Sequence, residues 1–328
     1  MKNKIAIVFT GGTISMKVDP RLNAVIPALT NDEILAMISN IERYSAIEVV
    51  NFARLPSPHI TPDIMCSLAK TIQEQLDRDD ITGVVVTHGT DTLEETAYFL
   101  DLILPPTKPI VIVGSMRSGS ELGYDGPSNL AAAICTAISP ASQNKGVLVV
   151  MNNEVNAARE VTKTNTLALN TFRSPEFGPL GIVDNDEVIY YRTLDPHQHY
   201  PIDHLESRVA LFKSTAGANS DFIDHALALG YKGIVIEALG RGNVPPEMAK
   251  GIYRALDQGI PVVIVSRCPT GRVRDTYGYE GAGKILHDRG AIFGYNLPGQ
   301  KARIKLMVSL SVTSNVQKIR SMFEMQPY

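Results

Sequence analysis

The fold is decided by one stretch near the start of the chain, Ile5-Ala6-Ile7-Val8-Phe9-Thr10-Gly11-Gly12-Thr13-Ile14-Ser15. Five consecutive apolar residues run directly into a turn that contains two glycines. A short apolar run that ends at glycine is typical of a buried strand in a parallel sheet covered on both faces. Similar runs recur at 83–86, 110–113 and 147–151. We therefore predict an α/β fold in which these strands alternate with helices.

Helix signals separate the apolar runs. Thr30-Asn31-Asp32-Glu33 has the capping-box pattern, in which the first and fourth residues satisfy each other's backbone N–H groups. Thr61-Pro62 places a capping residue before a proline at the first helical position. Helical periodicity also predicts helices at 92–104 and 127–139. This alternation favours a doubly wound parallel sheet.

A second block of the same type follows a break in the pattern. Two prolines and several polar residues at 195–201 are typical of a linker. Beyond it, we expect strands at 209–212, 233–236 and 262–265, and helices at 220–229, 246–258, 299–310 and 314–324. The sequence thus predicts two doubly wound parallel-sheet α/β domains. The larger N-terminal domain spans 1–190, a linker spans 191–208, and the smaller C-terminal domain spans 209–328.

Composition and charge exclude several classes of protein. Of the 328 residues, 44% are apolar and 20% are charged, which excludes a wholly disordered chain. Lys and Arg number 31 against 34 Asp and Glu, and a net charge of −3 argues against nucleic acid as a partner. No apolar run approaches the ~20 residues of a membrane span, so no membrane partner is expected.

The start of the chain and its cysteines predict a cytoplasmic protein. The apolar run at 5–9 is shorter than the about 7–15 residues of a signal-peptide core. Cys66, Cys135 and Cys268 are scattered and odd in number, which indicates a reducing compartment and no structural zinc. His197 and His199 are a conceivable metal pair, but no Cys or carboxylate motif completes a site beside them. An exposed connector is favoured there.

Three polar stretches are candidates for chemistry. The first is the turn after the first strand, at the sheet edge where open α/β folds bind ligands. Its glycines allow a close backbone approach, and Thr13 presents a hydroxyl beside N–H groups that can stabilise an oxyanion. An ordinary phosphate loop or a plain turn is the alternative. Neither the Gly-x-Gly-x-x-Gly nor the Gly-Lys-Ser/Thr pattern is present.

The second and third stretches carry an acid and a base. His88-Gly89-Thr90-Asp91-Thr92-Leu93 follows another strand, and Asp91 there favours a cationic group such as an amino-acid ammonium. The alternative is that Thr90, Asp91 or Thr92 caps the next helix and that His88 is structural. In Thr162-Lys163-Thr164, a lysine buried near Asp91 would help a threonine lose its proton.

Together these stretches resemble the bacterial-type L-asparaginase family, which includes glutaminase-asparaginases. Residues 7–15 match its first signature and residues 83–93 its second. Supporting similarity runs through 113–117, 162–166, 178–181 and 296–303. The resemblance implies a hydrolase that converts L-asparagine and water to L-aspartate and ammonia through an acyl-threonine intermediate, without metal or organic cofactor. It also implies homodimers or homotetramers, in which the N-terminal domain of one subunit and the C-terminal domain of its neighbour share each active site.

The same resemblance assigns roles to individual residues. Thr13 matches the nucleophile, and Thr90, Lys163 and Asp91 match the second catalytic group. Asp91 also matches the residue that contacts the substrate α-ammonium, and Ser57 the one that contacts its α-carboxylate. The substrate-binding set is Gly12, Ser57, Gly89, Thr90, Asp91 and Ser115, where a backbone group at Ser115 approaches the scissile amide.

Two departures from the family pattern bear on the mechanism. The family has an activating tyrosine after the first signature, whereas residues 14–29 contain none. The Thr90–Lys163 pair, or Tyr277 or Tyr279 from a partner subunit, is the expected substitute, unless both tyrosines merely pack. Asn243 and Glu280 are placed as partner-subunit site residues, with helix capping or turn formation as their alternative role. They are the residues that align least cleanly.

Other functions stay open at this point. A glutaminase-preferring relative is close, because one methylene separates the substrates and contributes only about 1–3 kcal/mol of discrimination. The amidase subunit of an archaeal tRNA-dependent amidotransferase is a second enzymatic alternative. A non-catalytic amino-acid-binding protein on the same fold is a third, and ammonia release from asparagine distinguishes it from an enzyme.

Overall fold

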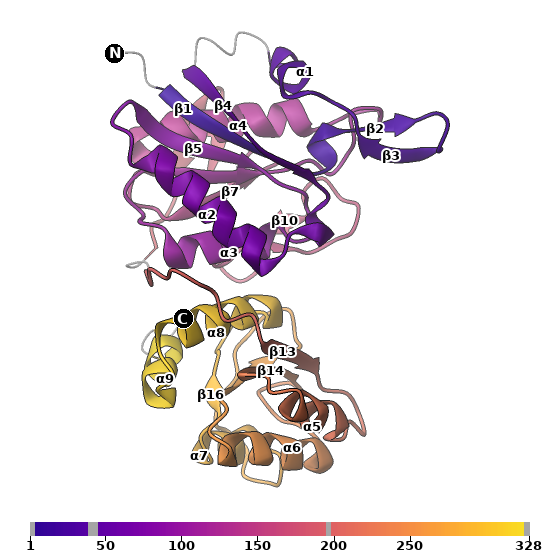
Figure 1. The fold of residues 1–328 in the computed structure, drawn as a ribbon, viewed down its shortest axis with the longest axis vertical. Coiled ribbons are helices and arrows are strands. Elements are labelled where there is room, and N and C mark those ends of the chain that lie inside the picture. The colour runs from indigo at the N-terminus through magenta and orange to yellow at the C-terminus, as the bar shows by residue number, and fades with distance from the viewer. Residues whose placement is uncertain (1–3, 39–44, 195–197, 325–328) are drawn as a thin grey trace. The chain divides into compact units, whose positions relative to one another are not determined.

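A computed structural model describes residues 4–38, 45–194 and 198–324 (Figure 1). The chain forms two compact units, Met1–His199 and Tyr200–Tyr328. The division falls inside the predicted linker, and the predicted boundaries at 190 and 208 themselves stay predictions. The α/β fold class is confirmed in both units.

The N-terminal unit is built on an eight-stranded sheet in the order β12-β11-β8-β7-β6-β5-β1-β4. Its parallel part is β4 (Ala46–Leu55), β1 (Lys4–Gly11), β5 (Ile81–Thr87), β6 (Ile110–Val113) and β7 (Val147–Met151). Every residue of β6 and β7 is buried, as a sheet covered on both faces requires. The four predicted strands of this domain are therefore confirmed, and β4 is an additional one.

Helices cover both faces of this sheet. Helices α2 (Pro62–Leu76) and α3 (Leu93–Ile103) contact each other, as do α1 (Asn31–Ala36) and α4 (Gly126–Ile138), and Figure 1 shows these pairs on opposite sides of the strands. The predicted capping box is present, because Thr30 and Glu33 accept from each other's backbone N–H groups. Thr61 caps α2 by accepting from the N–H of Ile64 at 3.3 Å.

The sheet departs from the prediction at one edge, where it is antiparallel. Strands β8 (Glu154–Ala157), β11 (Gly181–Asp184) and β12 (Glu187–Tyr190) extend it beyond β7. Asn152-Asn153 and Asn185-Asp186 join the two hairpins, with φ values of 52°, 61°, 45° and 68°. A two-residue loop with positive φ connects only antiparallel neighbours, so the sheet becomes mixed here.

Two smaller hairpins complete the unit. Strands β2 (Met16–Asp19) and β3 (Ala24–Pro27) pair directly after the Thr13 turn. Strands β9 (Thr162–Lys163) and β10 (Phe172–Arg173) pair further along the chain. Lys163 is therefore part of a short strand.

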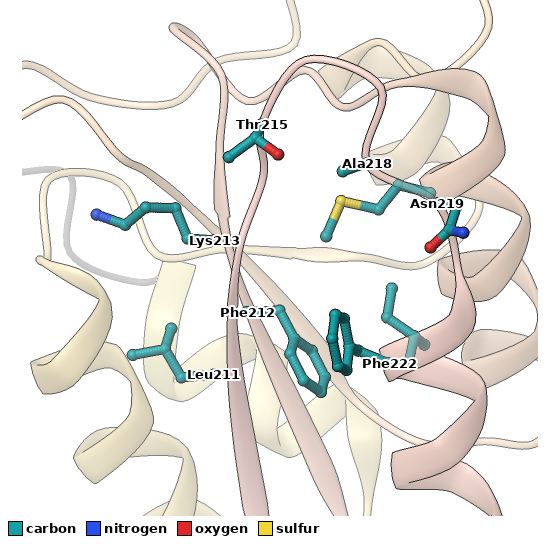
Figure 2. A pocket seen from close by; sticks show the side chains of 9 residues that line it. Leu211, Phe212, Lys213, Thr215, Ala218, Asn219 and Phe222 are labelled. Atoms are coloured by element: carbon teal, nitrogen blue, oxygen red, sulfur yellow. The ribbon is translucent and has the colours of Figure 1, made fainter.

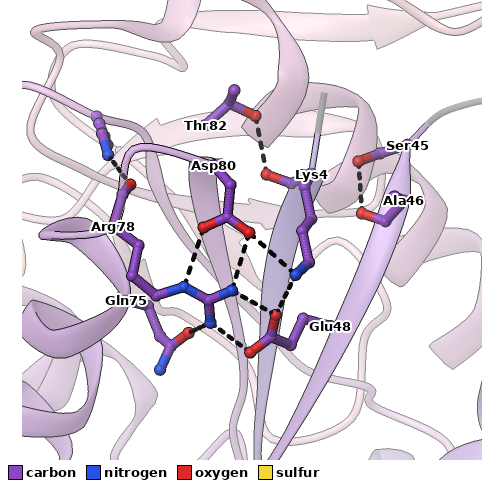
Figure 3. A network of polar contacts seen from close by, with 9 residues as sticks. Lys4, Ser45, Ala46, Glu48, Gln75, Arg78, Asp80 and Thr82 are labelled. Carbon is purple, nitrogen blue, oxygen red and sulfur yellow. Dashed lines mark hydrogen bonds and ion pairs between the residues drawn. The ribbon is translucent and has the colours of Figure 1, made fainter. Parts of the chain in front are cut away.

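A charged network joins the amino ends of β4 and β1 and the residues that precede β5 (Figure 3). Arg78 makes a two-pronged contact with Glu48 on β4, and it also contacts Asp80 at 2.9 Å. Lys4, the first residue of β1, pairs with both carboxylates. The hydrogen bonds from Arg78 and Lys4 lower the pKa of Glu48 to about 2. This network lies at the opposite end of the strands from the turns that carry the candidate residues.

The C-terminal unit is a four-stranded parallel sheet in the order β13-β14-β15-β16. Its strands are β13 (Val209–Lys213), β14 (Gly233–Ala238), β15 (Val262–Ser266) and β16 (Ile292–Phe293), of which the last was not predicted. Helices α8 (Gly299–Val312) and α9 (Val316–Glu324) cover one side (Figure 1). Helices α5 (Asp221–Ala228), α6 (Pro246–Asp257) and α7 (Gly283–Asp288) lie on the other, and α7 was also not predicted.

Candidate active site

Two glycine-rich turns meet at the carboxyl edge of the N-terminal sheet. Strands β1 and β5 are parallel neighbours, and Phe9, near the end of β1, pairs with Thr87, the last residue of β5. Gly12 has a φ of 87°, and a Cβ built on it would lie 2.5 Å from both the Cα and the N of Gly89. The two backbones are therefore in direct contact, and only glycine fits at position 12. The expected meeting of the two turns is present at the level of the backbone.

Ser57 lies in direct contact with the second turn. It follows β4 and is buried, and its hydroxyl accepts a hydrogen bond from the N–H of Asp91 at 3.1 Å. Its carbonyl accepts from the hydroxyl of Thr92 at 2.9 Å. A Cβ on Gly89 would lie 2.8 Å from both Cβ and Oγ of Ser57. Thr92 is the N-cap residue of α3, but its side chain makes no capping hydrogen bond. Helix capping therefore does not account for the hydrogen bond that its hydroxyl donates to Ser57.

Lys163 joins Thr90 and Asp91. Its Nζ donates to Thr90 Oγ1 at 2.9 Å and to Asp91 Oδ1 at 2.7 Å. The Lys163 side chain is 17% exposed, whereas that of Asp91 is 62% exposed. The lysine thus lies mostly inside the protein, and the carboxylate keeps an open side for another cation.

Glu94 holds the strand that delivers Lys163, although no sequence pattern singles it out. This buried residue of α3 accepts from the hydroxyl of Thr162 at 3.0 Å and from the N–H of Lys163 at 3.3 Å. A carboxylate in the first turn of a helix is ordinarily explained by the helix dipole. Glu94 has a second role in holding Thr162 and Lys163, and only these long-range contacts in the folded protein reveal it.

The Ser115 turn follows β6 and abuts the second turn. A Cβ on Gly114 would lie 2.7 Å from the carbonyl oxygen of His88 and 3.2 Å from Cγ2 of Thr90. Ser115 is fully buried, and its hydroxyl donates to Asp125 Oδ1 at 2.7 Å. The structure therefore brings together seven of the predicted residues, namely Gly12, Ser57, Gly89, Thr90, Asp91, Ser115 and Lys163.

Thr13 begins the short helical turn Thr13–Ser15 directly after Gly12. Within the described residues, its backbone N–H and that of Thr90 donate no hydrogen bond, and the Thr13 hydroxyl has no partner. Thr90 is buried and Thr13 is half-buried, and N–H groups that are shielded from water are rarely left unpaired without a reason. Two such donors in touching turns are a suitable arrangement for an anionic oxygen.

His88, the first residue of the second turn, is completely buried. Burial lowers its pKa to about 4, so the imidazole is neutral at physiological pH. Its Nδ1 lies 2.7 Å from the carbonyl oxygen of Gly89, and that carbonyl requires the proton on Nδ1. A neutral, turn-holding histidine agrees with the structural interpretation of His88.

The C-terminal unit gathers its four candidates in one pair of loops. The loops that follow β14 and β15 are joined by a bond from the N–H of Val244 to the carbonyl of Gly281 at 2.8 Å. The candidates on them are Asn243, Tyr277, Tyr279 and Glu280. Tyr277 and Tyr279 are 44% and 56% exposed, with ring centroids 5.9 Å apart. Asn243 Oδ1 accepts from the N–H of Gly283, the first residue of α7, at 3.1 Å, which agrees with its capping alternative.

A separate cavity in the C-terminal unit contains none of the candidates. It has a volume of about 480 Å³, and Figure 2 shows the rings of Phe212 and Phe222 side by side in its wall. Lys213 at its rim is already paired with Glu237 at 3.0 Å. The other residues that line it are Leu211, Thr215, Ala218, Asn219, Ile223 and Met248. Because the cavity is lined largely by apolar side chains, we do not assign a catalytic nucleophile and its base to it.

Metal-ligating groups are not clustered in the described part of the chain. Across 4–38, 45–194 and 198–324, no group of three or more His, Cys, Asp or Glu side chains is arranged to hold a metal ion. His199 Nε2 contacts the carbonyl of Ile103 at 3.1 Å, and His197 lies outside the described residues.

Among the helices of those same ranges, none is long and apolar enough to cross a bilayer.

Comparison with known proteins identifies the family. Residues 4–196 match the family model described as "Asparaginase, N-terminal", and residues 208–323 match the "Glutaminase/Asparaginase C-terminal domain". The chain belongs to the L-asparaginase family. This confirms the resemblance drawn from the two signatures, and it makes the protein a member of a family of amide-hydrolysing enzymes.

Individual relatives support the assignment of this chain to the asparaginase family. It is 38% identical to an L-asparaginase of Bacillus licheniformis, over 95% of this chain and 96% of that protein. A solved structure of a probable cytoplasmic L-asparaginase from Campylobacter jejuni superposes with a TM-score of 0.88 at 33% identity, covering 98% and 99% of the two chains. One subunit of a glutamyl-tRNA(Gln) amidotransferase from Methanosarcina barkeri is 33% identical over 94% of this chain and 74% of its own length.

Proposed function

We propose that this asparaginase-family enzyme hydrolyses L-asparagine to L-aspartate and ammonia through an acyl ester on Thr13. The observation that carries the proposal is the backbone contact between Gly12 and Gly89, because it brings the hydroxyl-bearing turns of Thr13 and Thr90 to one place. The names of full-length relatives support the substrate.

In the first half of the reaction, the Thr13 oxygen attacks the side-chain carboxamide carbon. The negative charge that develops on the carbonyl oxygen is taken by the unpaired N–H groups of Thr13 and Thr90. Each such donor contributes about 10²–10³ in rate. The C–N bond then breaks, and the proton from the Thr13 hydroxyl leaves with the nitrogen as part of ammonia.

In the second half, water attacks the ester carbon and returns a proton to the Thr13 oxygen. A threonine hydroxyl and a water are both weak nucleophiles without a base. The hydrogen-bonded chain Thr90–Lys163–Asp91 is the group that relays these protons. General acid–base catalysis of this kind contributes about 10²–10⁴ in rate.

The substrate's charged ends have separate partners in this proposal. The open side of the Asp91 carboxylate binds the α-ammonium, and the Ser57 turn binds the α-carboxylate. A backbone group at Ser115 approaches the scissile amide. A site that pairs both charges of an amino acid rejects simple amides, because their binding would cover the open side of Asp91 without supplying the ammonium group that pairs with it.

We further propose that the active enzyme is a homodimer or homotetramer with shared sites, in which Asn243, Tyr277, Tyr279 and Glu280 reach a neighbouring subunit's turns. Tyr277 and Tyr279 are exposed, so a partner subunit can contact their rings. When the protein is diluted until sedimentation shows only monomers, ammonia release should be abolished. A monomer with full specific activity would contradict the shared site.

A cytoplasmic location is part of the same proposal. All three cysteines are free, as in a reducing compartment. The similar Campylobacter jejuni protein is called cytoplasmic, while another relative is called periplasmic, so cell fractionation is the deciding measurement.

Ammonia release from L-asparagine tests the function directly. Thr13→Ala should lose turnover by at least about a thousandfold, because the reacting group itself is removed, while its thermal unfolding should match that of the wild type. A Thr13→Ala variant with wild-type turnover would refute the acyl-threonine route. Aspartate binding without any turnover in the wild type would favour an amino-acid-binding protein.

Two rival activities are separated in the same assay. The ratio of kcat/KM for L-asparagine and L-glutamine decides between asparaginase and glutaminase preference. Release of ammonia without any tRNA argues against the amidotransferase alternative, and so does the net charge of −3.

A further inference from the structure

A second loop grips the segment that follows Thr13. Residues 14–18 end the Thr13 turn and form most of strand β2, and residues 119–124 lie against them. Three long-range hydrogen bonds make this contact. They run from the Tyr124 hydroxyl to the Ile14 carbonyl, from the N–H of Gly119 to the Met16 carbonyl at 2.9 Å, and from the N–H of Val18 to the Ser120 hydroxyl at 3.0 Å.

The bond from Tyr124 reaches the turn of the nucleophile itself. In that turn, the Gly12 carbonyl accepts from the N–H of Ser15 at 3.0 Å, and the Thr13 carbonyl accepts from the N–H of Met16. Both bonds are local. The Ile14 carbonyl instead accepts from Tyr124, which is 110 residues away in the sequence. Residues 14–29 contain no tyrosine, so the phenol beside this turn comes from a different segment.

Tyr124 is held firmly enough to act as a fixed donor. Its ring lies against Gly126, where a Cβ would come within 2.4 Å of Cε2 and of the hydroxyl oxygen. Its neighbour Asp125 accepts from the N–H groups of Met116 at 3.1 Å and Arg117 at 2.9 Å. Burial and the charge of Asp125 raise the pKa of Tyr124 well above that of a free phenol, so the hydroxyl keeps its proton.

We infer that Tyr124 is a positioning residue for the proposed Thr13 nucleophile, because its hydroxyl fixes the Ile14 carbonyl and thereby the turn that aims the Thr13 side chain. The inference rests on the proposed function. Tyr124 contacts the backbone of the turn rather than the reacting atoms, so its contribution is to geometry. A displacement of about 1 Å between reacting groups can lower a rate by ~10²-fold.

Tyr124→Phe removes the hydroxyl and keeps the ring. We expect kcat for ammonia release to fall about 10- to 100-fold, with KM changed by less than about threefold, because substrate contacts remain in place. The pH profile of kcat should keep both limbs at a lower plateau, since no titrating group is lost. Gly126→Ala should lower kcat as well, because the added methyl displaces the ring while the phenol is retained.

Tyr190→Phe is the matched control. Tyr190 is also a tyrosine with a hydrogen-bonded hydroxyl, 2.7 Å from Ser142 Oγ, but it lies on the edge strand β12. Its substitution makes the same chemical change at the opposite edge of the sheet from β4. We expect it to leave kcat and KM unchanged, so that any loss in Tyr124→Phe reflects its place beside the turn.

Several outcomes would overturn the inference. Equal kcat in Tyr124→Phe and Tyr190→Phe would show that the bond to Ile14 does not serve turnover. Loss of one limb of the pH profile would make Tyr124 an acid–base group instead. A change in KM alone would make it a binding residue. If Tyr124→Phe fails to fold, Gly126→Ala with wild-type kcat overturns the inference in its place.

Other results would show that the proposed function itself is wrong. They are absent ammonia release in the wild-type protein, or full activity in Thr13→Ala. An active parent and an inactive Thr13→Ala variant, together with an unimpaired Tyr124→Phe variant, would reject only the role of Tyr124.

Discussion

Gly12→Ala tests the contact on which the proposed site depends. A Cβ at this position would lie 2.5 Å from Cα and N of Gly89, and 2.8 Å from the carbonyl carbon of His88. Ordinary contact begins at 3.4 Å, so the two turns would have to separate by about 0.9 Å. The atoms that are met belong to the backbone of the buried residues His88 and Gly89, and no flexible side chain can move aside.

The expected loss follows from this displacement. Misplacing reacting groups by about 1 Å lowers rates by ~10²-fold, and the separation also moves the N–H of Thr90 away from that of Thr13. Alanine at a φ of 87° adds backbone strain of about 1–2 kcal/mol. We therefore expect Gly12→Ala to fold with reduced stability and to release ammonia at least about a hundredfold more slowly.

Gly178→Ala separates strain from crowding. Gly178 has a φ of 72°, yet nothing lies within 4 Å of a Cβ built there. It should therefore lose stability like Gly12→Ala while keeping its turnover. Ammonia release and thermal unfolding should be measured on both variants. If Gly12→Ala keeps kcat within about threefold of Gly178→Ala, the reasoning that the touching turns form the site is refuted.

Three further predictions concern charged side chains. Lys163→Met should lower kcat by about 10²–10⁴ if the lysine relays protons, and unchanged turnover would reject that role. Asp91→Asn should raise KM strongly and lower kcat, whereas a change in thermal stability alone would favour helix capping. Glu48→Gln should destabilise the protein at pH 7 by only about 1 kcal/mol, since its ion pairs are open to solvent. The pKa of Glu48 is lowered to about 2, so this contribution is present above pH ~4.5 and is lost as the pH falls towards 2. Thermal melts of Glu48→Gln and wild type should therefore converge in acid, and a difference that grows in acid would contradict the assignment.

Local signals are sufficient for most of the secondary structure. The capping box at Thr30 and the cap at Thr61 depend on residues within four positions, so the sequence alone determines them. The apolar runs of β1, β5, β6 and β7 are buried on both faces and cannot be confused with amphipathic segments. Their order along the chain is enough to predict the α/β class.

The edges of the sheet are harder to predict. Strand β4 has exposed and half-buried residues in place of an apolar run, because it lies at the edge of the sheet. The antiparallel edge, by contrast, has a local signal in its hairpin turns, Asn152-Asn153 and Asn185-Asp186. Asparagine and aspartate tolerate positive φ, so such pairs indicate antiparallel strands, although the apolar runs around them suggested a wholly parallel sheet.

The supporting residues of the candidate site have no local signal at all. Glu94 reaches Thr162 across 68 positions, and Tyr124 reaches Ile14 across 110. Each is an ordinary residue at the start of a helix or in a loop until the fold brings its partner near. Sequence patterns therefore found the groups proposed to react, because family signatures preserve them, and missed the groups that hold them.

The parallel order of the strands explains why these distant groups meet. Gly11 pairs with Leu55, Phe9 with Thr87, and Thr87 with Val113, so the turns after β4, β1, β5 and β6 leave the same edge side by side. The ion network of Lys4, Glu48 and Arg78 lies at the other end of these strands. Substitutions in that network should therefore change stability without moving the turns. Substitutions at the glycines should move the turns as well as lower stability, because they alter the spacing of the turns although they leave most of the buried apolar surface intact.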